Sequence, residues 1–129
     1  MRKGEDGGSE ILLITSRETR RWVIPKGWPI PGKSGPQTAA VEAYEEAGIR
    51  GYPLPQSIGS YRYDKRVGEG TDTIPCEVTV FQMRSFAQLE DWPERSQRRS
   101  KWFTRTQAAS CVDEAELADL IVRLPITSS

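Results

Sequence analysis

The stretch VEAYEEAGI, from Val41 to Ile49, brings three glutamates close together near the end of a predicted helix. Glu42 and Glu46 share one face of that helix, and Glu45 lies beside them. Like charges three or four residues apart on a helix repel by about 0.2–0.5 kcal/mol per pair. Carboxylates near a helix C-terminus also oppose the helix dipole, at a cost of about 0.3–1 kcal/mol each. The crowding therefore requires an explanation.

The segment before this helix, PKGWPIPGKSGP from Pro25 to Pro36, predicts a stiff loop. Four prolines and three glycines in twelve residues exclude regular structure there. Ser34 or Gly35 can cap the helix that follows, and Pro36 suits its first turn. The helix is predicted over residues 37–47, with Gly48 as its C-terminal stop.

Two interpretations of the glutamates follow from this arrangement. A solvated helix face is the ordinary one. The other is a cation site, because Mg²⁺ prefers oxygen ligands and binds a few carboxylates together with substrate phosphates. A divalent ion would turn the repulsion into attraction, and it would lower the pKa of a bound water.

The run from Gly27 to Ile49 resembles the signature of the Nudix family. That signature is Gly, five residues, Glu, seven residues, then Arg-Glu-U-x-Glu-Glu-x-Gly-U, with U a bulky aliphatic residue. The spacing is kept throughout, and the matching residues are Gly27, Glu42, Glu45, Glu46, Gly48 and Ile49. The segment LEDWPERSQRRSKWF, residues 89–103, further resembles diphosphoinositol polyphosphate and diadenosine polyphosphate hydrolases of this family. The resemblance covers most of residues 10–112.

Three positions depart from the signature. Lys33 stands where the family has its first Glu, Val41 replaces the Arg, and Ala43 is small for an aliphatic position. In the family the Glu and Arg are expected to pair and to brace the loop against the helix. Because both members of the pair are replaced, neither charge is left without its partner. The departures therefore affect the catalytic efficiency and the exact geometry of the loop, and they leave the metal ligands unchanged.

The resemblance implies a Mg²⁺-dependent hydrolase that cleaves a diphosphate linkage in a nucleoside or inositol polyphosphate. Glu42 and Glu46 would hold Mg²⁺, with Mn²⁺ as a second candidate, together with a backbone carbonyl near Gly27. Glu45 would join the metal set, or hold or deprotonate the attacking water. The alternative is a catalytically weakened Nudix domain that binds or senses a diphosphate-containing ligand.

Basic residues around the loop are candidates for binding the polyanionic substrate. Their alternative is an ordinary surface position. Trp28 in the loop, and less so Trp92, could stack on a ligand, whereas Trp22 and Trp102 are predicted to be core. Glu69 and Glu94 are further carboxylates that could serve as ligand or base. The substrate-binding candidates are Arg20, Lys26, Gly27, Arg62 and Lys65.

The chain is predicted to form one α+β domain over residues 1–129. A terminal amphipathic helix is predicted over residues 113–124, N-capped by Asp113. The family resemblance implies an α/β/α sandwich with a mixed, largely antiparallel sheet. Residues 1–9 are expected to be a flexible N-terminus, and the first strand of the family is expected to be missing. The other predicted elements are strands 10–15, 22–24, 57–66, 75–84 and 101–103 and a helix over 106–112.

The composition excludes several function classes. Eighteen basic and eighteen acidic residues give a formal net charge of zero, which argues against a nucleic-acid polymer or a membrane surface as partner. The chain has no histidine, so histidine-based catalysis is excluded. Cys76 and Cys111 are too few for a disulfide scaffold, and the longest apolar run, Ile11 to Ile14, is far too short to span a membrane. We therefore expect a cytoplasmic protein that binds a small phosphorylated substrate. A missing edge strand would make a homodimer a candidate assembly.

Overall fold

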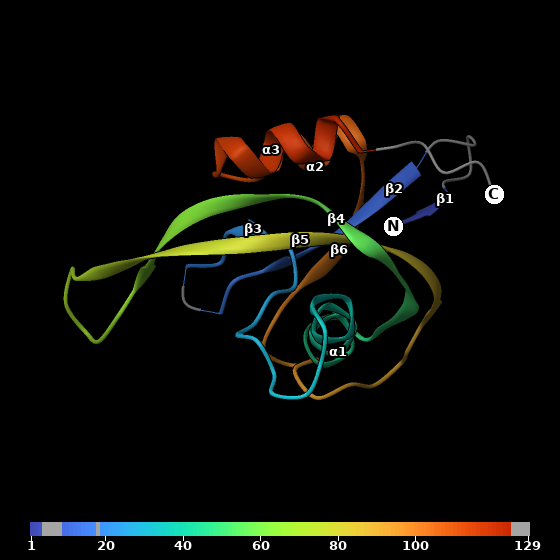
Figure 1. Ribbon diagram of the computed structural model, residues 1–129, viewed down its shortest axis with the longest axis horizontal. Helices are drawn as coiled ribbons and strands as arrows, with labels where there is room; N and C mark the ends of the chain where they lie inside the picture. The colour runs from blue at the N-terminus through green and yellow to red at the C-terminus, as the bar shows by residue number, and fades with distance from the viewer. Residues whose placement is uncertain (4–8, 18, 125–129) are drawn as a thin grey trace.

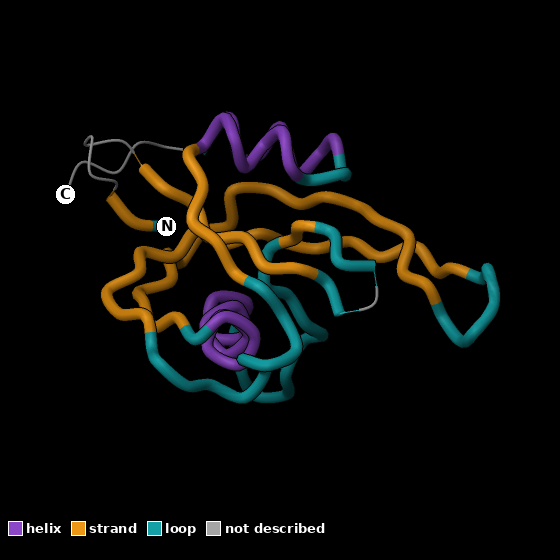
Figure 2. The backbone as a smooth tube through the Cα atoms, turned by 180° about the vertical axis from the view of Figure 1, so that it is seen from behind, coloured by secondary structure: helices purple, strands orange, loops and turns teal. Residues whose placement is uncertain are grey.

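The computed structural model describes residues 1–3, 9–17 and 19–124. Its strands and helices are arranged with α1 on one side of the strands and α2 and α3 on the other (Figure 1). The same layers are visible from behind in Figure 2. The elements in chain order are β1 (Arg2–Lys3), β2 (Ser9–Thr15), β3 (Trp22–Val23), α1 (Gly35–Ala47), β4 (Ile49–Arg66), β5 (Thr73–Gln88), β6 (Ser100–Thr104), α2 (Arg105–Cys111) and α3 (Ala115–Val122).

Strand β2 is the centre of the first sheet. It pairs antiparallel with β1, β3 and β6. Residues 11–15 of β2 are all buried, which a strand covered on both faces requires. The second sheet is the long antiparallel hairpin of β4 and β5, which the sequence predicted in shorter form. The expected α+β class and largely antiparallel pairing are confirmed.

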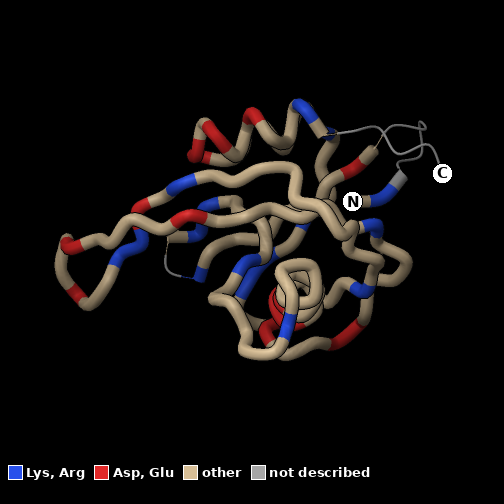
Figure 3. Tube along the Cα trace, viewed as in Figure 1, with Lys and Arg blue, Asp and Glu red and all other residues tan. Residues whose placement is uncertain are grey.

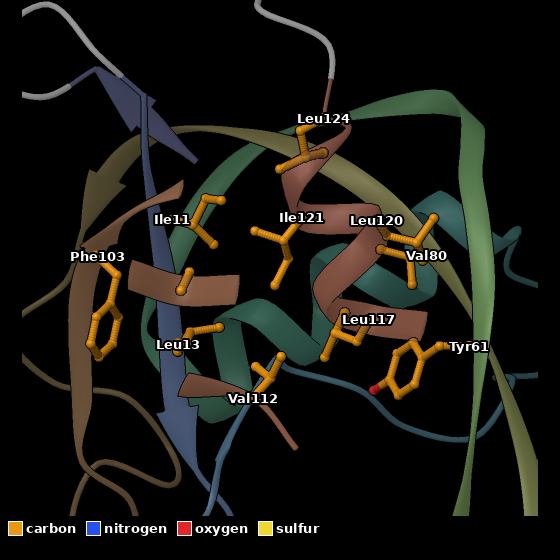
Figure 4. Packing of buried hydrophobic residues seen from close by; sticks show 11 residues of the cluster. Ile11, Leu13, Tyr61, Val80, Phe103, Val112, Leu117, Leu120, Ile121 and Leu124 are labelled. Atoms are coloured by element: carbon orange, nitrogen blue, oxygen red, sulfur yellow. The ribbon is translucent and has the colours of Figure 1, made fainter. Parts of the chain in front are cut away.

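Two clusters of buried side chains lie on opposite faces of β2, because successive residues of a strand point to opposite sides. Ile11 and Leu13 belong to the larger cluster, which α2, α3 and the hairpin complete. Figure 4 shows Leu117, Leu120 and Ile121 of α3 in this cluster. Leu12 and Ile14 belong to the second cluster, where α1 contributes Ala43 and Ala47. The second cluster thus fixes α1 against the central strand.

The C-terminal end of α1 is as the sequence predicted, whereas its start lies two residues earlier, at Gly35, with Ser34 as the cap. The Ser34 hydroxyl accepts a hydrogen bond from the backbone N–H of Gln37, and the Gln37 side chain accepts one from the backbone N–H of Ser34, so the two form a capping box. Gly48 ends the helix in the left-handed conformation, with φ of 68°. These two local signals set the limits of the acidic helix.

The N-terminal expectation needs correction. Arg2 and Lys3 form β1, which pairs with Glu10 and Ser9 of β2, so the strand expected to be missing is present in short form. The N-terminal ammonium of Met1 donates a hydrogen bond of 2.9 Å to the carbonyl of Met83. These contacts place the start of the chain against β2 and β5. Residues 4–8 of the expected flexible segment lie outside the described residues.

The predicted cap of the last helix is wrong. Helix α3 begins after Glu114, and no side chain caps it. The Asp113 carboxylate instead lies 3.3 Å from the Arg21 guanidinium, which also holds Glu114 at 2.9 Å. The Asp113 side chain therefore forms a long-range ion pair with Arg21 instead of the predicted cap of α3.

The aromatic residues divide largely as predicted. Trp22 and Trp102 are half-buried and pack against the two clusters. Trp28 is 61% exposed in the loop before α1. Among the described helices none has both the length and the apolar character needed to cross a bilayer.

Candidate active site

The carboxylates of α1 and the loop before it meet at Gly27. An ideal Cβ built on Gly27 would overlap the Glu42 carboxylate, with Oε2 at 2.8 Å and the other two carboxylate atoms closer still. Only a residue without a side chain therefore allows this close approach. The first glycine of the motif positions loop backbone directly beside a candidate metal ligand.

Glu46 lies next to Glu42 on the same helix face, and it is buried. Its Oε1 lies 3.4 Å from the backbone N–H of Lys26 and 3.7 Å from Nη2 of Arg98. The pKa of Glu46 is raised to about 8, first by burial and then by a hydrogen bond with the Glu42 side chain, against the opposing charge of Arg98. Two carboxyl groups joined by such a hydrogen bond share one proton. A cation bound between them can replace that proton and neutralise their charge.

Glu45, the third carboxylate of the motif, is half-buried. Its backbone carbonyl accepts a hydrogen bond of 3.0 Å from the N–H of Glu94, which ties α1 to the segment after β5. Within the described part of the chain no three acidic, histidine or cysteine side chains gather as a metal-binding group. The structure thus brings Glu42 and Glu46 together, and the role of Glu45 stays a prediction.

Arg98 is the site residue that sequence reasoning missed. Its side chain is only 11% exposed, and its Nε lies 2.9 Å from Glu94 Oε1. Its Nη1 donates a hydrogen bond of 3.2 Å to the carbonyl of Thr15, at the end of β2. The segment contains three arginines, at 95, 98 and 99, and no spacing rule distinguishes the buried one. The same contact engages Glu94, so this carboxylate, a candidate base, is paired.

The predicted substrate-binding residues differ in where they lie. Lys26 is closest to the carboxylates, and burial lowers its pKa. The Lys26 ammonium lies 4.9 Å from the centre of the Tyr63 ring, and the Lys65 ammonium lies 4.8 Å from that of Trp28. Both lysines therefore stand around the loop that carries Gly27. Figure 3 shows acidic and basic segments meeting at α1.

Two of the predicted substrate-binding residues, Arg62 and Arg20, contact groups other than the Glu42 and Glu46 carboxylates. The Arg62 guanidinium lies 3.6 Å from Glu116 of α3 and is exposed, so it faces the opposite layer from α1. Arg20 has a positive φ of 56° and donates a hydrogen bond of 3.4 Å to the carbonyl of Gln97. Arg20 therefore stays near the segment that carries Arg98, whereas Arg62 is removed from the carboxylates.

The donors of this site fit a hard divalent cation. They are the Glu42 and Glu46 carboxylates and the backbone of a rigid loop that approaches them at Gly27. Such oxygen atoms suit Mg²⁺, which usually takes one or two protein carboxylates and completes its shell with water and substrate. Lys33 is exposed, so the lost pair of the signature leaves no buried charge behind.

Comparison with known proteins identifies the family. A sequence model of the NUDIX domain matches residues 3–123, so the chain belongs to the NUDIX domain family. The crystal structure of a C. elegans Ap4A hydrolase covers 94% of this chain and 86% of its own, with 24% identity and a TM-score of 0.61. A binary complex of a C. elegans Ap4A hydrolase gives a TM-score of 0.65 at 22% identity and the same coverage. The fold is thereby shared with these structures.

Curated relatives show the same family at higher identity. Nudix hydrolase 12, mitochondrial, of Arabidopsis thaliana is 32% identical over 101 residues, which are 77% of this chain and 50% of the relative. Diphosphoinositol polyphosphate phosphohydrolase 3-alpha of Mus musculus is 31% identical over 97 residues, 73% of this chain and 54% of the relative. The chain spans about half the length of these two relatives.

Proposed function

We propose that this protein is a Mg²⁺-dependent hydrolase that cleaves a diphosphate linkage in a nucleoside or inositol polyphosphate. The observation that carries this proposal is the meeting of buried Glu46 and half-buried Glu42 beside Gly27 and Arg98, with a hydrogen bond between the two carboxyl groups. A buried carboxyl that stays protonated up to about pH 8 is poorly placed for stability alone, which favours a functional role.

Each residue of the site has a proposed role in the reaction. Glu42 and Glu46 would hold the cation as ionised carboxylates. The ion would neutralise phosphate charge and lower the pKa of the attacking water. Glu45 holds or deprotonates that water, with a carboxylate as general base. Arg98 holds Glu46 in place, and the Gly27 backbone limits where the Glu42 carboxylate can lie.

The substrate class is supported by the charges around the loop. Lys26 and Lys65 offer ammonium groups for a polyphosphate, and the exposed Trp28 beside Lys65 offers a face for a base or a ring. Arg20 and Arg62 remain weaker candidates because they bind Gln97 and Glu116. The names of the relatives, a diphosphoinositol polyphosphate phosphohydrolase and an Ap4A hydrolase, favour an inositol diphosphate or a dinucleoside polyphosphate.

The alternative is a domain that binds such a ligand without turning it over. Lys33 and Val41 favour it, because they remove the pair expected to brace the loop. The presence in the sequence of all three motif glutamates, Glu42, Glu45 and Glu46, favours the enzyme.

Phosphate release from a panel of diphosphoinositol polyphosphates and dinucleoside polyphosphates, with and without Mg²⁺ or Mn²⁺, tests the proposal. Hydrolysis that requires the metal supports the enzyme. Glu45→Gln should then lower kcat by orders of magnitude at unchanged thermal stability. A panel member that raises Tm with Mg²⁺ but is never cleaved would support the binding alternative.

The remaining expectations are also part of the proposal. We propose a single domain over residues 1–129, a cytoplasmic location and, as a candidate assembly, a homodimer. The dimer is favoured by the outer edge of β4, which among the described residues pairs only with β5. Sedimentation velocity and imaging of the tagged protein test the assembly and the location.

A further inference from the structure

Strands β2 and β5 each have an edge that no described strand fills. Strand β6 occupies one edge of β2 along residues 10–14. On the other edge β1 pairs with residues 9–10 and β3 with residues 14–15, so residues 11–13 have no partner strand there among the described residues. Strand β5 pairs with β4 along one edge, and the described strands leave its second edge unpaired. Both sheets therefore present open ladder positions.

The position of β1 shows that these two edges face each other. Arg2 pairs antiparallel with Glu10 of β2. Beside it, the Met1 nitrogen donates a hydrogen bond of 2.9 Å to the carbonyl of Met83, and the N–H of Ser85 donates one of 2.9 Å to the carbonyl of Met1. Bonds from one residue to both neighbours of another are the pattern of a parallel ladder. The start of β1 thus lies between β2 and β5, which are two strand spacings, about 10 Å, apart at this point.

Next to Met1 the gap between the two sheets contains an apolar cavity. Its volume is about 140 Å³, and side chains from both sheets and from the helices on both sides line it. Protein interiors have few voids larger than a water molecule, so a void of this size is unusual. The lining includes Leu12 of β2, Val80 of β5, Ala43 of α1 and Leu120 of α3. The gap is therefore shaped by both sheets and is incompletely filled.

We propose that this gap is the docking site of one further β-strand, joined to the amino end of β1, which runs antiparallel to β2 and parallel to β5. The occupant belongs to the same chain, because β1 already directs its amino end into the gap and bonds to both sheets. Arg2 stands opposite Glu10, so continuing this register places the added residues opposite Leu12 and Leu13 of β2. On β5 the same residues continue the parallel ladder from Met83 toward Val80.

The surroundings of the gap specify an apolar strand. Leu12 belongs to the cluster that includes Ala43 of α1, and Leu13 belongs to the cluster that includes α3, so successive side chains of the added strand enter both clusters. A strand buried on both faces is an unbroken apolar run. The small volume of the cavity favours Ala and Val over larger side chains, which would overpack it. Ala39 and Ala43 line the cavity, so the strand also supports the acidic helix from its buried side.

Extended forms of the protein test the proposal. One form carries the sequence Val-Ala-Val-Ala before Met1, and the matched control carries Ser-Gly-Ser-Gly in its place. We expect the apolar extension to raise Tm by about 10 °C over the control, because it fills a void and adds ladder hydrogen bonds. Amide hydrogen exchange should slow at residues 11–13 and 80–83 in the apolar form alone. An equal Tm in the two forms, or unchanged exchange at either edge, would overturn the proposal.

Two further measurements separate strand pairing from other modes of binding. A Val-Pro-Val-Pro extension keeps the apolar character and removes N–H donors, so its Tm should stay close to that of the Ser-Gly control. A Tm equal to that of the Val-Ala form would show apolar contact without a ladder and contradict the proposal. Sedimentation velocity should give the same assembly state for the Val-Ala and Ser-Gly forms. A dimer formed by the Val-Ala form alone would place the strand in a second copy of the chain and overturn the assignment to the same chain.

Discussion

Replacing Gly27 by alanine should separate the fold of this protein from its metal site. Gly27 is not among the glycines with positive φ, so alanine fits the backbone without strain. The new methyl group would, however, overlap the Glu42 carboxylate. Its Oε2 at 2.8 Å must retreat by at least 0.6 Å to reach the 3.4 Å of ordinary contact, and the two nearer atoms must retreat further. The carboxylate is the end of a flexible side chain, so it will move rather than unfold the helix.

A displacement of about 1 Å at a catalytic group can lower a rate about a hundredfold. We therefore expect Gly27→Ala to lower kcat/KM by about that factor and to weaken the apparent affinity for Mg²⁺. The metal-free protein should keep its thermal stability within about 1 kcal/mol, since alanine also restricts the unfolded chain.

The measurements are metal titrations of the hydrolysis rate and of Mn²⁺ binding without substrate. Gly70→Ala is the control, because a Cβ there meets nothing within 4 Å. Wild-type Mg²⁺ dependence in Gly27→Ala would refute the claim that this contact positions Glu42.

Three further predictions concern stability. The pKa of Glu46 is raised from 4.5 to about 8, so the metal-free folded protein retains a proton that the unfolded chain has released between these values. Its stability should fall as the pH rises from about 5 to about 8, by about 4 kcal/mol at most, and chemical denaturation of Glu46→Gln should show this fall removed. Arg98→Met should lower the free energy of unfolding by about 3 kcal/mol, because Arg98 is only 11% exposed and its loss leaves the half-buried Glu94 carboxylate without its cation. Arg123→Met breaks only an exposed pair worth about 0–1 kcal/mol. Equal losses of Tm would refute the burial argument. Gly48→Ala and Gly68→Ala share a left-handed φ, with a cost of about 1–2 kcal/mol. Only at position 48 does the new Cβ overlap Trp92, so Gly48→Ala should lower Tm further, and a matching Tm would show that Trp92 moves freely.

The acidic helix could be predicted closely from sequence because its signals are local. Ser34 with Gln37 sets its start and Gly48 its end, and helical periodicity places Glu42 next to Glu46. Strand β2 was equally clear, since an unbroken apolar run fits a strand covered on both faces. The predicted cap of α3 was wrong because the deciding contact is not local. Arg21, from a distant part of the chain, pairs with Asp113 and Glu114.

The sequence by itself determined the family motif, the limits of α1 and the face on which two carboxylates meet, because backbone preference and helical repeat act over a few residues. Only the tertiary structure decided that Arg98 reaches Glu46 and that Arg62 turns to α3. Those contacts join residues dozens of positions apart. They depend on how sheets and helices dock, which no local pattern encodes.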